Sequence, residues 1–208
     1  MTGVYVASVP GEKELLEAWD RGDERAAQAL LTRHFDRLFR FFELSAPGAA
    51  EDLVQETLLA ALEGRERYRA DANFGAYLMG IARKKVLMYW RTRSRRPREV
   101  DVGALSLEAL GASATSVLAH RDAERRLLLA LRVIPLADQL LLQMHYWDAL
   151  TGPELASALD VPEGTVRSRL RSAKARLREC AEANGSTRGA DADSFDDWVR
   201  SLRERLHR

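Results

Sequence analysis

The sequence predicts an all-α protein with two small helical domains joined by a flexible linker, the second ending in a helix-turn-helix, plus a short C-terminal helical extension. Three observations support this class. Nearly every periodic stretch repeats its apolar residues at helical spacing, and no convincing strand pattern appears. Residues 98–116, which have small side chains and little periodicity, separate two groups of such stretches. Residues 151–178 have the pattern of a short helix, a tight turn and a second helix rich in arginine.

The first domain, expected over residues 1–97, contains four predicted helices. The first covers about residues 12–21 and ends at Gly22, and Asp23 can cap the second, which continues to about residue 43. The third covers about residues 50–62. After a loop, Asn73 can cap a long fourth helix that reaches about residue 96, where Pro97 stops it.

Residues 98–120 are expected to form the linker, and residues 121–180 the second domain. This domain begins with helices at about residues 121–133 and 136–146, with Pro135 between them. The helix-turn-helix follows. Thr151 can cap its first helix, with Glu154 as capping-box partner and Pro153 in the first turn. Residues 160–164 break that helix and start the second.

Basic residues gather in two places, although the net charge of the chain is only +1. The second helix of the helix-turn-helix carries six basic residues and one acid, Glu163. Residues 83–98 carry eight basic residues and no acid. Two separate basic clusters indicate two surfaces that face phosphates. The second helix of such a motif lies in the DNA major groove, so DNA binding is favoured over an ordinary surface hairpin.

Other features of the sequence argue against several protein classes. Cys180 is the single cysteine, so no internal disulfide can form, and a reducing compartment fits. No apolar run approaches the roughly 20 residues that cross a bilayer, and the N-terminus lacks a signal-peptide pattern. We therefore expect a cytoplasmic protein without membrane insertion. Because the four histidines lack metal-ligand spacing and no nucleophile or phosphate-loop motif occurs, we expect no catalytic residue, no metal, no cofactor and no enzymatic activity.

Three segments resemble regions of bacterial sigma factors. Residues 50–62, AEDLVQETLLAAL, and residues 74–96, FGAYLMGIARKKVLMYWRTRSRR, resemble the second region, and residues 151–177 resemble the fourth. In this order they resemble the extracytoplasmic-function (ECF) group of the sigma-70 family, over about residues 12–177. The resemblance implies a transcription initiation factor that binds core RNA polymerase and directs it to promoters. It implies recognition of the minus-thirty-five duplex and melting of the minus-ten element.

The resemblance also implies site residues in the first domain. Polymerase binding is assigned to the third helix, through Asp52, Leu53, Gln55 and Glu56. Minus-ten DNA is assigned to the fourth helix and the loop before it, through Arg69, Asp71, Asn73, Phe74, Arg83, Lys84, Tyr89, Trp90, Arg91 and Arg95. Some of these have a structural alternative: Phe74 is at least as well explained as a core residue, Asn73 as a helix cap, and one of Tyr89 and Trp90 as core.

In the second domain, the resemblance assigns the minus-thirty-five duplex to the helix-turn-helix, through Thr151, Thr165, Arg167, Ser168, Arg171, Ser172 and Lys174. Arg171 and Ser172 depart from the residues frequent in the family, so the base preference is expected to differ. An anti-sigma factor is an implied partner.

Two alternatives remain open at this point. A conventional helix-turn-helix regulator would need a sensor domain that residues 1–120 do not suggest, and an interaction adaptor would tend to be acidic. The extension, residues 181–208, contains a predicted helix at about residues 194–207 that either packs on the adjacent domain or masks a binding face.

Overall fold

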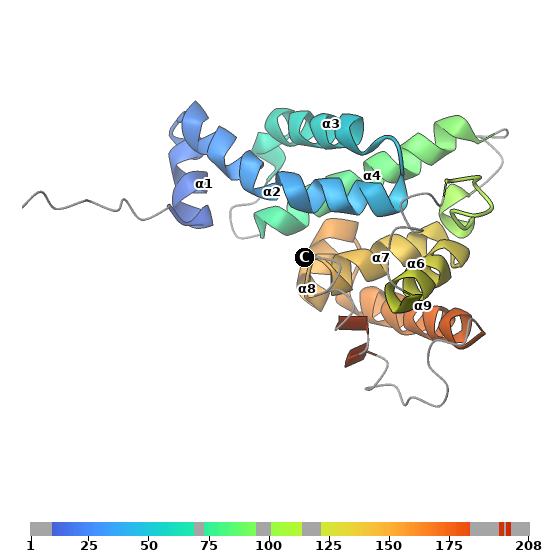
Figure 1. Cartoon of the computed structure of the whole chain (residues 1–208). Coiled ribbons are helices and arrows are strands. Elements are labelled where there is room, and N and C mark those ends of the chain that lie inside the picture. The colour runs from blue at the N-terminus through green and yellow to red at the C-terminus, as the bar shows by residue number, and fades with distance from the viewer. Residues whose placement is uncertain are drawn as a thin grey trace, which may run out of the picture. The chain divides into compact units, whose positions relative to one another are not determined.

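The computed structural model describes residues 10–68, 73–94, 101–113, 122–183, 196–197 and 199–200 (Figure 1). Within these ranges the regular elements are α-helices and 3-10 helices, and β-pairing is limited to an isolated bridge between Ser106 and Pro135. The all-α prediction is confirmed. The chain divides into two compact units, Met1–Arg37 and Leu38–Arg208. None of the described helices has both the length and the apolar character needed to cross a bilayer.

The unit Met1–Arg37 contains α1 (Glu12–Asp20) and the first part of α2 (Glu24–Ser45). Gly22 adopts a φ of 89°, which a glycine allows at little cost, and the chain turns there. Asp23 then caps α2, because its Oδ1 accepts hydrogen bonds from the backbone N–H groups of Arg25 at 2.9 Å and Ala26 at 3.2 Å. Both the turn and the cap were predicted from the sequence.

Helices α3 (Ala50–Glu63) and α4 (Phe74–Arg93) pack against each other, with the 3-10 helix η1 (Arg65–Arg67) between them in sequence. Asn73 caps α4 as predicted, because its Oδ1 accepts a hydrogen bond from Ala76 N at 3.0 Å. Near the other end of α4, the indole N–H of Trp90 donates to Ser45 O at 2.8 Å and ties the helix to the end of α2. Helix α4 ends at Arg93, earlier than predicted, because Ser94 is already extended.

The helices α6 (Asp122–Val133), α7 (Leu136–Tyr146), α8 (Gly152–Leu159) and α9 (Glu163–Ala183) follow. Their shared core includes Leu127, Leu131, Leu142, Ala173 and Leu177. The predicted helix-turn-helix is thus α8, a turn and α9. The capping box of α8 is present, since Thr151 N donates to Glu154 Oε2 at 2.7 Å. Asp160 ends α8 in the left-handed conformation, with a φ of 54°.

Within the predicted linker, residues 101–113 have local structure that the sequence did not indicate. This segment forms the 3-10 helix η2 (Val102–Ala104) and buries Val102 and Leu107. It is fastened to the helices that follow, because Leu136 N donates to Leu105 O at 2.8 Å. The sequence did not reveal this packing because the two buried residues have no helical or strand period. Their burial depends on partners distant in the sequence.

One part of the C-terminal extension, residues 196–197 and 199–200, is described. Val199 is fully buried in the core formed by α6, α7 and α9, which supports the prediction that the extension packs on the adjacent domain. The other apolar residues of the predicted final helix, Phe195, Trp198, Leu202 and Leu206, lie outside the described residues.

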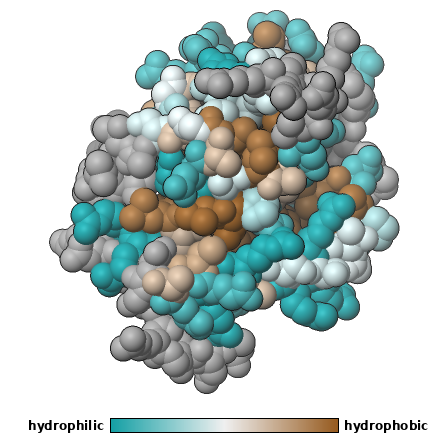
Figure 2. Space-filling model, turned by 90° about the vertical axis from the view of Figure 1, so that its right-hand side faces the viewer, coloured by the Kyte–Doolittle hydropathy of each residue, from teal (hydrophilic) through white to brown (hydrophobic). Residues whose placement is uncertain are grey.

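Some large apolar side chains of the described residues remain exposed: Phe35, Leu59, Leu62, Met88 and Val133. On the face drawn in Figure 2, a band of apolar residues is bordered by hydrophilic ones.

Candidate nucleic-acid interface

The outer face of α3 carries the residues predicted to bind polymerase, with one exception. Asp52, Gln55 and Glu56 are exposed, whereas Leu53 is only 4% exposed and belongs to the core. Leu53 therefore shapes this surface from within. Glu56 Oε2 accepts a hydrogen bond from Lys85 Nζ of α4 at 2.9 Å, which fixes the direction of that carboxylate.

The same face of α3 also presents two leucines that sequence reasoning missed. Leu59 is 55% exposed and Leu62 is 43% exposed. Residues 52, 55, 59 and 62 are three or four positions apart, so they lie along one side of the helix. The sequence could have indicated this larger surface, because Leu59 and Leu62 continue the three- and four-residue spacing of the polar positions 52 and 55.

The loop before α4, predicted to capture an unstacked base, is only partly described. Arg69 and Asp71 lie outside the described residues, as does Arg95 at the far end of the basic stretch. Phe74 is fully buried, and its ring meets the ring of Tyr68 edge to face at 5.3 Å between centroids. The core alternative for Phe74 is therefore correct in this structure, because the ring offers no face to a base.

Asn73 has a second contact besides its capping role. Its side-chain amide donates to Glu154 Oε1 of α8 at 2.6 Å. A residue predicted to contact minus-ten DNA is thus bonded to the first helix of the helix-turn-helix.

The basic side chains of α4 differ in their access to solvent. Lys84 and Arg91 are exposed. Arg83 is half-buried, and burial together with the positive charge of Arg169 lowers the pKa of its guanidinium. Tyr89 is partly buried, and the Arg93 guanidinium lies 3.8 Å from the centre of its ring, a cation–π contact.

Of the two adjacent aromatic residues on α4, Trp90 is the core residue. It is 6% exposed, and its indole N–H bonds to Ser45 O. The prediction that one of Tyr89 and Trp90 belongs to the core is confirmed. Trp90 anchors the helix, and Tyr89 is the partly exposed one.

Helix α9 has a buried side and an exposed side. Val166, Ala173 and Leu177 face the core, with less than 1% of their surface exposed. The predicted DNA contacts Arg167, Ser168, Arg171 and Ser172 are all exposed on the first turns, and Thr165 is partly exposed. A helix side that carries cations and small hydroxyl groups, opposite a well-packed buried side, is suited to contact base edges and phosphates in a DNA groove.

Two residues of the helix-turn-helix that are predicted to contact DNA already interact with side chains of the protein itself. The Thr151 hydroxyl donates to Glu154 Oε2 at 2.7 Å, so it serves the capping box. Arg167 forms an exposed ion pair with Glu163, with 3.0 Å between Nη2 and Oε1. An exposed pair of this kind is weak and readily exchanges for a phosphate.

Lys174 is not oriented like the other predicted contacts. Its Nζ lies 2.5 Å from Asp196 Oδ2 and 5.1 Å from the centre of the Tyr146 ring. Asp196 belongs to the C-terminal extension and was not predicted as a site residue. No local pattern relates it to Lys174, from which it is separated by 22 positions.

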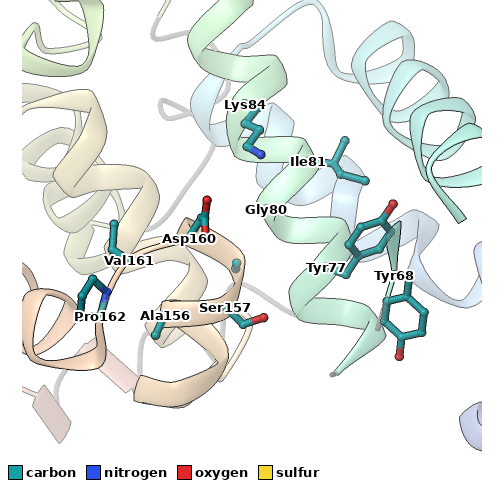
Figure 3. A pocket seen from close by; sticks show the side chains of 11 residues that line it. Tyr68, Tyr77, Gly80, Ile81, Lys84, Ala156, Ser157, Asp160, Val161 and Pro162 are labelled. Atoms are coloured by element: carbon teal, nitrogen blue, oxygen red, sulfur yellow. The ribbon is translucent and has the colours of Figure 1, made fainter. Parts of the chain in front are cut away.

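A cavity of about 740 Å³ lies where α4 faces α8 (Figure 3). Tyr77, Gly80, Ile81 and Lys84 line it from α4, and the helix-turn-helix contributes Ala156, Ser157, Ala158, Asp160, Val161 and Pro162. At its edge the two helices come close together: a Cβ on Gly80 would lie 2.6 Å from Ala158 O. Among the described residues, no group of His, Cys, Asp and Glu is arranged to hold a metal ion.

Comparison with known proteins gives matches to two family models. The model described as sigma-70 region 2 matches residues 25–96, and the one described as sigma-70, region 4 matches residues 124–177. The ECF RNA polymerase sigma-E factor of Escherichia coli strain K12 is 24% identical over 168 residues, which cover 76% of this chain and 88% of that protein. The RNA polymerase sigma-H factor of Pseudomonas aeruginosa is 24% identical over 169 residues, with the same coverage.

Two solved structures share the fold. The sigma factor RpoE in complex with the anti-sigma factor NepR, from Bartonella quintana, has a TM-score of 0.56 and 20% identity, covering 76% of this chain and 97% of that one. CnrH in complex with the cytosolic domain of CnrY has a TM-score of 0.54 and 20% identity, covering 83% and 98%. The two regions in this order favour a sigma factor over a conventional helix-turn-helix regulator. The chain belongs to the ECF group of the sigma-70 family of RNA polymerase sigma factors.

Proposed function

We propose that this sigma factor binds core RNA polymerase through the outer face of α3 and directs it to promoters whose upstream duplex is read by α9. The observation that carries the proposal is the exposed side of α9, where Arg167, Ser168, Arg171 and Ser172 stand free of the core. These four side chains lie on two successive turns of one helix, and a helix fits the depth and width of a major groove. The names of the related proteins support the same function.

Arg171 is the residue to which we assign base selectivity. It is exposed, and its planar guanidinium can donate two hydrogen bonds to the O6 and N7 of a guanine. Such a pair contributes about 1–3 kcal/mol of discrimination against other bases. Arg167, once released from Glu163, contacts phosphates, which positions the helix without reading sequence.

The minus-ten element is assigned to α4 and the loop before it. Lys84 and Arg91 are exposed cations for the backbone of the DNA, and the partly exposed Tyr89 supports a base or sugar. Residues 69–73 remain the proposed site of base capture. Binding energy from the separated strand then offsets the cost of unpairing.

Engaging both promoter elements requires α4 and α8 to separate. The two elements are about 25 base pairs apart, which is about 85 Å of B-DNA at 3.4 Å per pair. In the structure, Gly80 of α4 lies against Ala158 of α8, and Asn73 is bonded to Glu154. The described arrangement therefore belongs to the chain before promoter binding, and residues 1–97 and 121–180 act as separate domains on DNA.

An anti-sigma factor is the proposed inhibitory partner, because two solved relatives of the same fold are bound to such proteins or to a cytosolic domain. We place the protein in the cytoplasm with the polymerase. Its role is to direct the chemistry of the polymerase, and we assign no reaction to its own residues.

The test is to reconstitute the purified chain with core polymerase and select initiating promoters from a random DNA pool. We expect two enriched blocks separated by a fixed spacing. Arg171→Ala should remove base preference from the upstream block only, whereas Arg91→Ala should weaken initiation on all sequences alike. Arg171→Lys is the matched control, since it keeps the charge but loses the two-pronged donor. Enrichment of no sequence, or of a single block, contradicts the proposal.

A further inference from the structure

We propose that the Asp196 carboxylate of the C-terminal extension occupies the position beside Lys174 that a DNA phosphate would take. This contact thereby weakens binding of α9 to upstream DNA. The inference rests on the proposed function of α9 as a duplex reader. It assigns to the extension a role that the two sigma regions, which end at residue 177, do not include.

The first argument is the geometry of the carboxylate. Both oxygens of Asp196 are used: Oδ2 contacts Lys174 Nζ at 2.5 Å, and Oδ1 accepts a hydrogen bond from the Tyr146 hydroxyl, also at 2.5 Å. Lys174 and Asp196 are 28% and 22% exposed, so the pair is partly shielded from water. Shielding strengthens the attraction between the charges compared with an ion pair on the surface.

The second argument is that the core of the second domain holds Asp196 in position. Val199, three residues later and on the same face of the helical turn, is fully buried among residues of α6, α7 and α9. The acid is therefore supplied by a docked segment. Its effective concentration at Lys174 exceeds that of a phosphate arriving from solution.

The third argument is the position of Lys174 on α9. It is three residues after the exposed Arg171, a spacing that makes the two side chains neighbours on the helix surface, so it borders the side of the helix that we assign to DNA. A free ammonium there would extend the row of cations by one. With Asp196 in place, its charge is already neutralised.

The protonation state of Asp196 is consistent with this role. Burial alone would raise the pKa of its carboxyl, but the hydrogen bonds from Lys174 and Tyr146 outweigh burial, and the pKa is lowered. The carboxylate is charged at neutral pH.

The experiment measures the affinity of the full chain for an upstream duplex as a function of salt concentration. Asp196→Asn removes the charge and keeps an oxygen for the Tyr146 hydroxyl. One additional phosphate contact should steepen the slope of log K against log [salt] by about 0.9 and tighten binding roughly 8-fold at 0.1 M salt. Asp197→Asn is the matched control, because that carboxylate is 77% exposed and pairs only with nearby Arg200 in the described residues.

Lys174→Ala provides the second arm, which does not depend on the stability of the Asp196 variant. In the unmodified chain, Lys174→Ala should leave the salt slope unchanged, because Lys174 does not contact DNA there. In the Asp196→Asn background it should return the slope to its original value. A slope that Asp196→Asn does not change, or that Lys174→Ala lowers in the unmodified chain, overturns the inference. Absence of duplex binding by the unmodified chain even when it is assembled with core polymerase would instead contradict the proposed function.

Discussion

Gly80 lies against α8, and Gly80→Ala is expected to push α4 and α8 apart. The added Cβ would lie 2.6 Å from Ala158 O and 3.3 Å from the carbonyl carbon and the Cα of the same residue. These are backbone atoms, so no side-chain rotation relieves the overlap and the helix itself must move. Overpacking of this kind costs about 1–3 kcal/mol. Within α4 alone the substitution is favourable by about 1 kcal/mol, because alanine forms helix better than glycine.

A cost of about 2 kcal/mol at the contact would raise the ratio of separated to packed chains roughly 30-fold, since about 1.4 kcal/mol corresponds to a factor of ten. Fluorescence energy transfer measures this change directly. Cys180 is replaced by serine, and dyes are attached to cysteines introduced at the exposed positions Glu63 of α3 and Glu182 of α9. The transfer efficiency should fall in Gly80→Ala, while the helix content by circular dichroism stays the same.

Gly164→Ala is the control for this experiment. Gly164 lies in the first turn of α9, and a Cβ there meets no atom within 4 Å. The reasoning is refuted if Gly80→Ala leaves the transfer efficiency at its original value, or if Gly164→Ala lowers it equally.

Three further predictions concern α3, α4 and α7. Leu53→Ala should lower the free energy of unfolding by about 2–5 kcal/mol, whereas Asp52→Ala should leave it unchanged and slow the association with core polymerase in stopped-flow measurements; a reversed outcome contradicts the division between core and surface. Trp90→Phe leaves Ser45 O without its donor and should cost about 1–3 kcal/mol in urea unfolding, and a loss below 0.5 kcal/mol would contradict an anchoring role. Burial lowers the pKa of His145 from its ordinary value of 6.5, so the unfolded chain takes up the proton first and the stability should fall from pH 7 to pH 5. His145→Gln should flatten this dependence in thermal melts, and an unchanged pH profile would assign it to other groups.

The helices and their ends could be predicted because the signals are local. Asp23, Asn73 and the Thr151–Glu154 pair bond to atoms within three residues of themselves, so the residue type and the spacing suffice. The exposed side of α9 follows from the same reasoning, since the apolar period identifies its buried side.

Features that depend on distant partners could not be predicted. The burial of Leu107 depends on packing that no nearby pattern announces. Lys174 fits the cationic row by its sequence position, yet its ammonium is held by Asp196 and Tyr146. Phe74 fits base stacking equally well by residue type, and only its burial in the folded chain, with its ring against Tyr68, identifies it as core.

On the proposed function, the packing of residues 101–113 limits how far apart the two parts assigned to DNA can lie. From the end of α4 at Arg93 to the start of α6 at Asp122, a fully released chain of 28 residues would extend about 95 Å. While residues 101–113 remain packed on the helices that follow, the tether shortens to residues 94–100, or about 25 Å. On the proposed function, a chain that keeps this packing tolerates few promoter spacer lengths, and a chain that loses it accepts a wider range with weaker cooperation between the two elements.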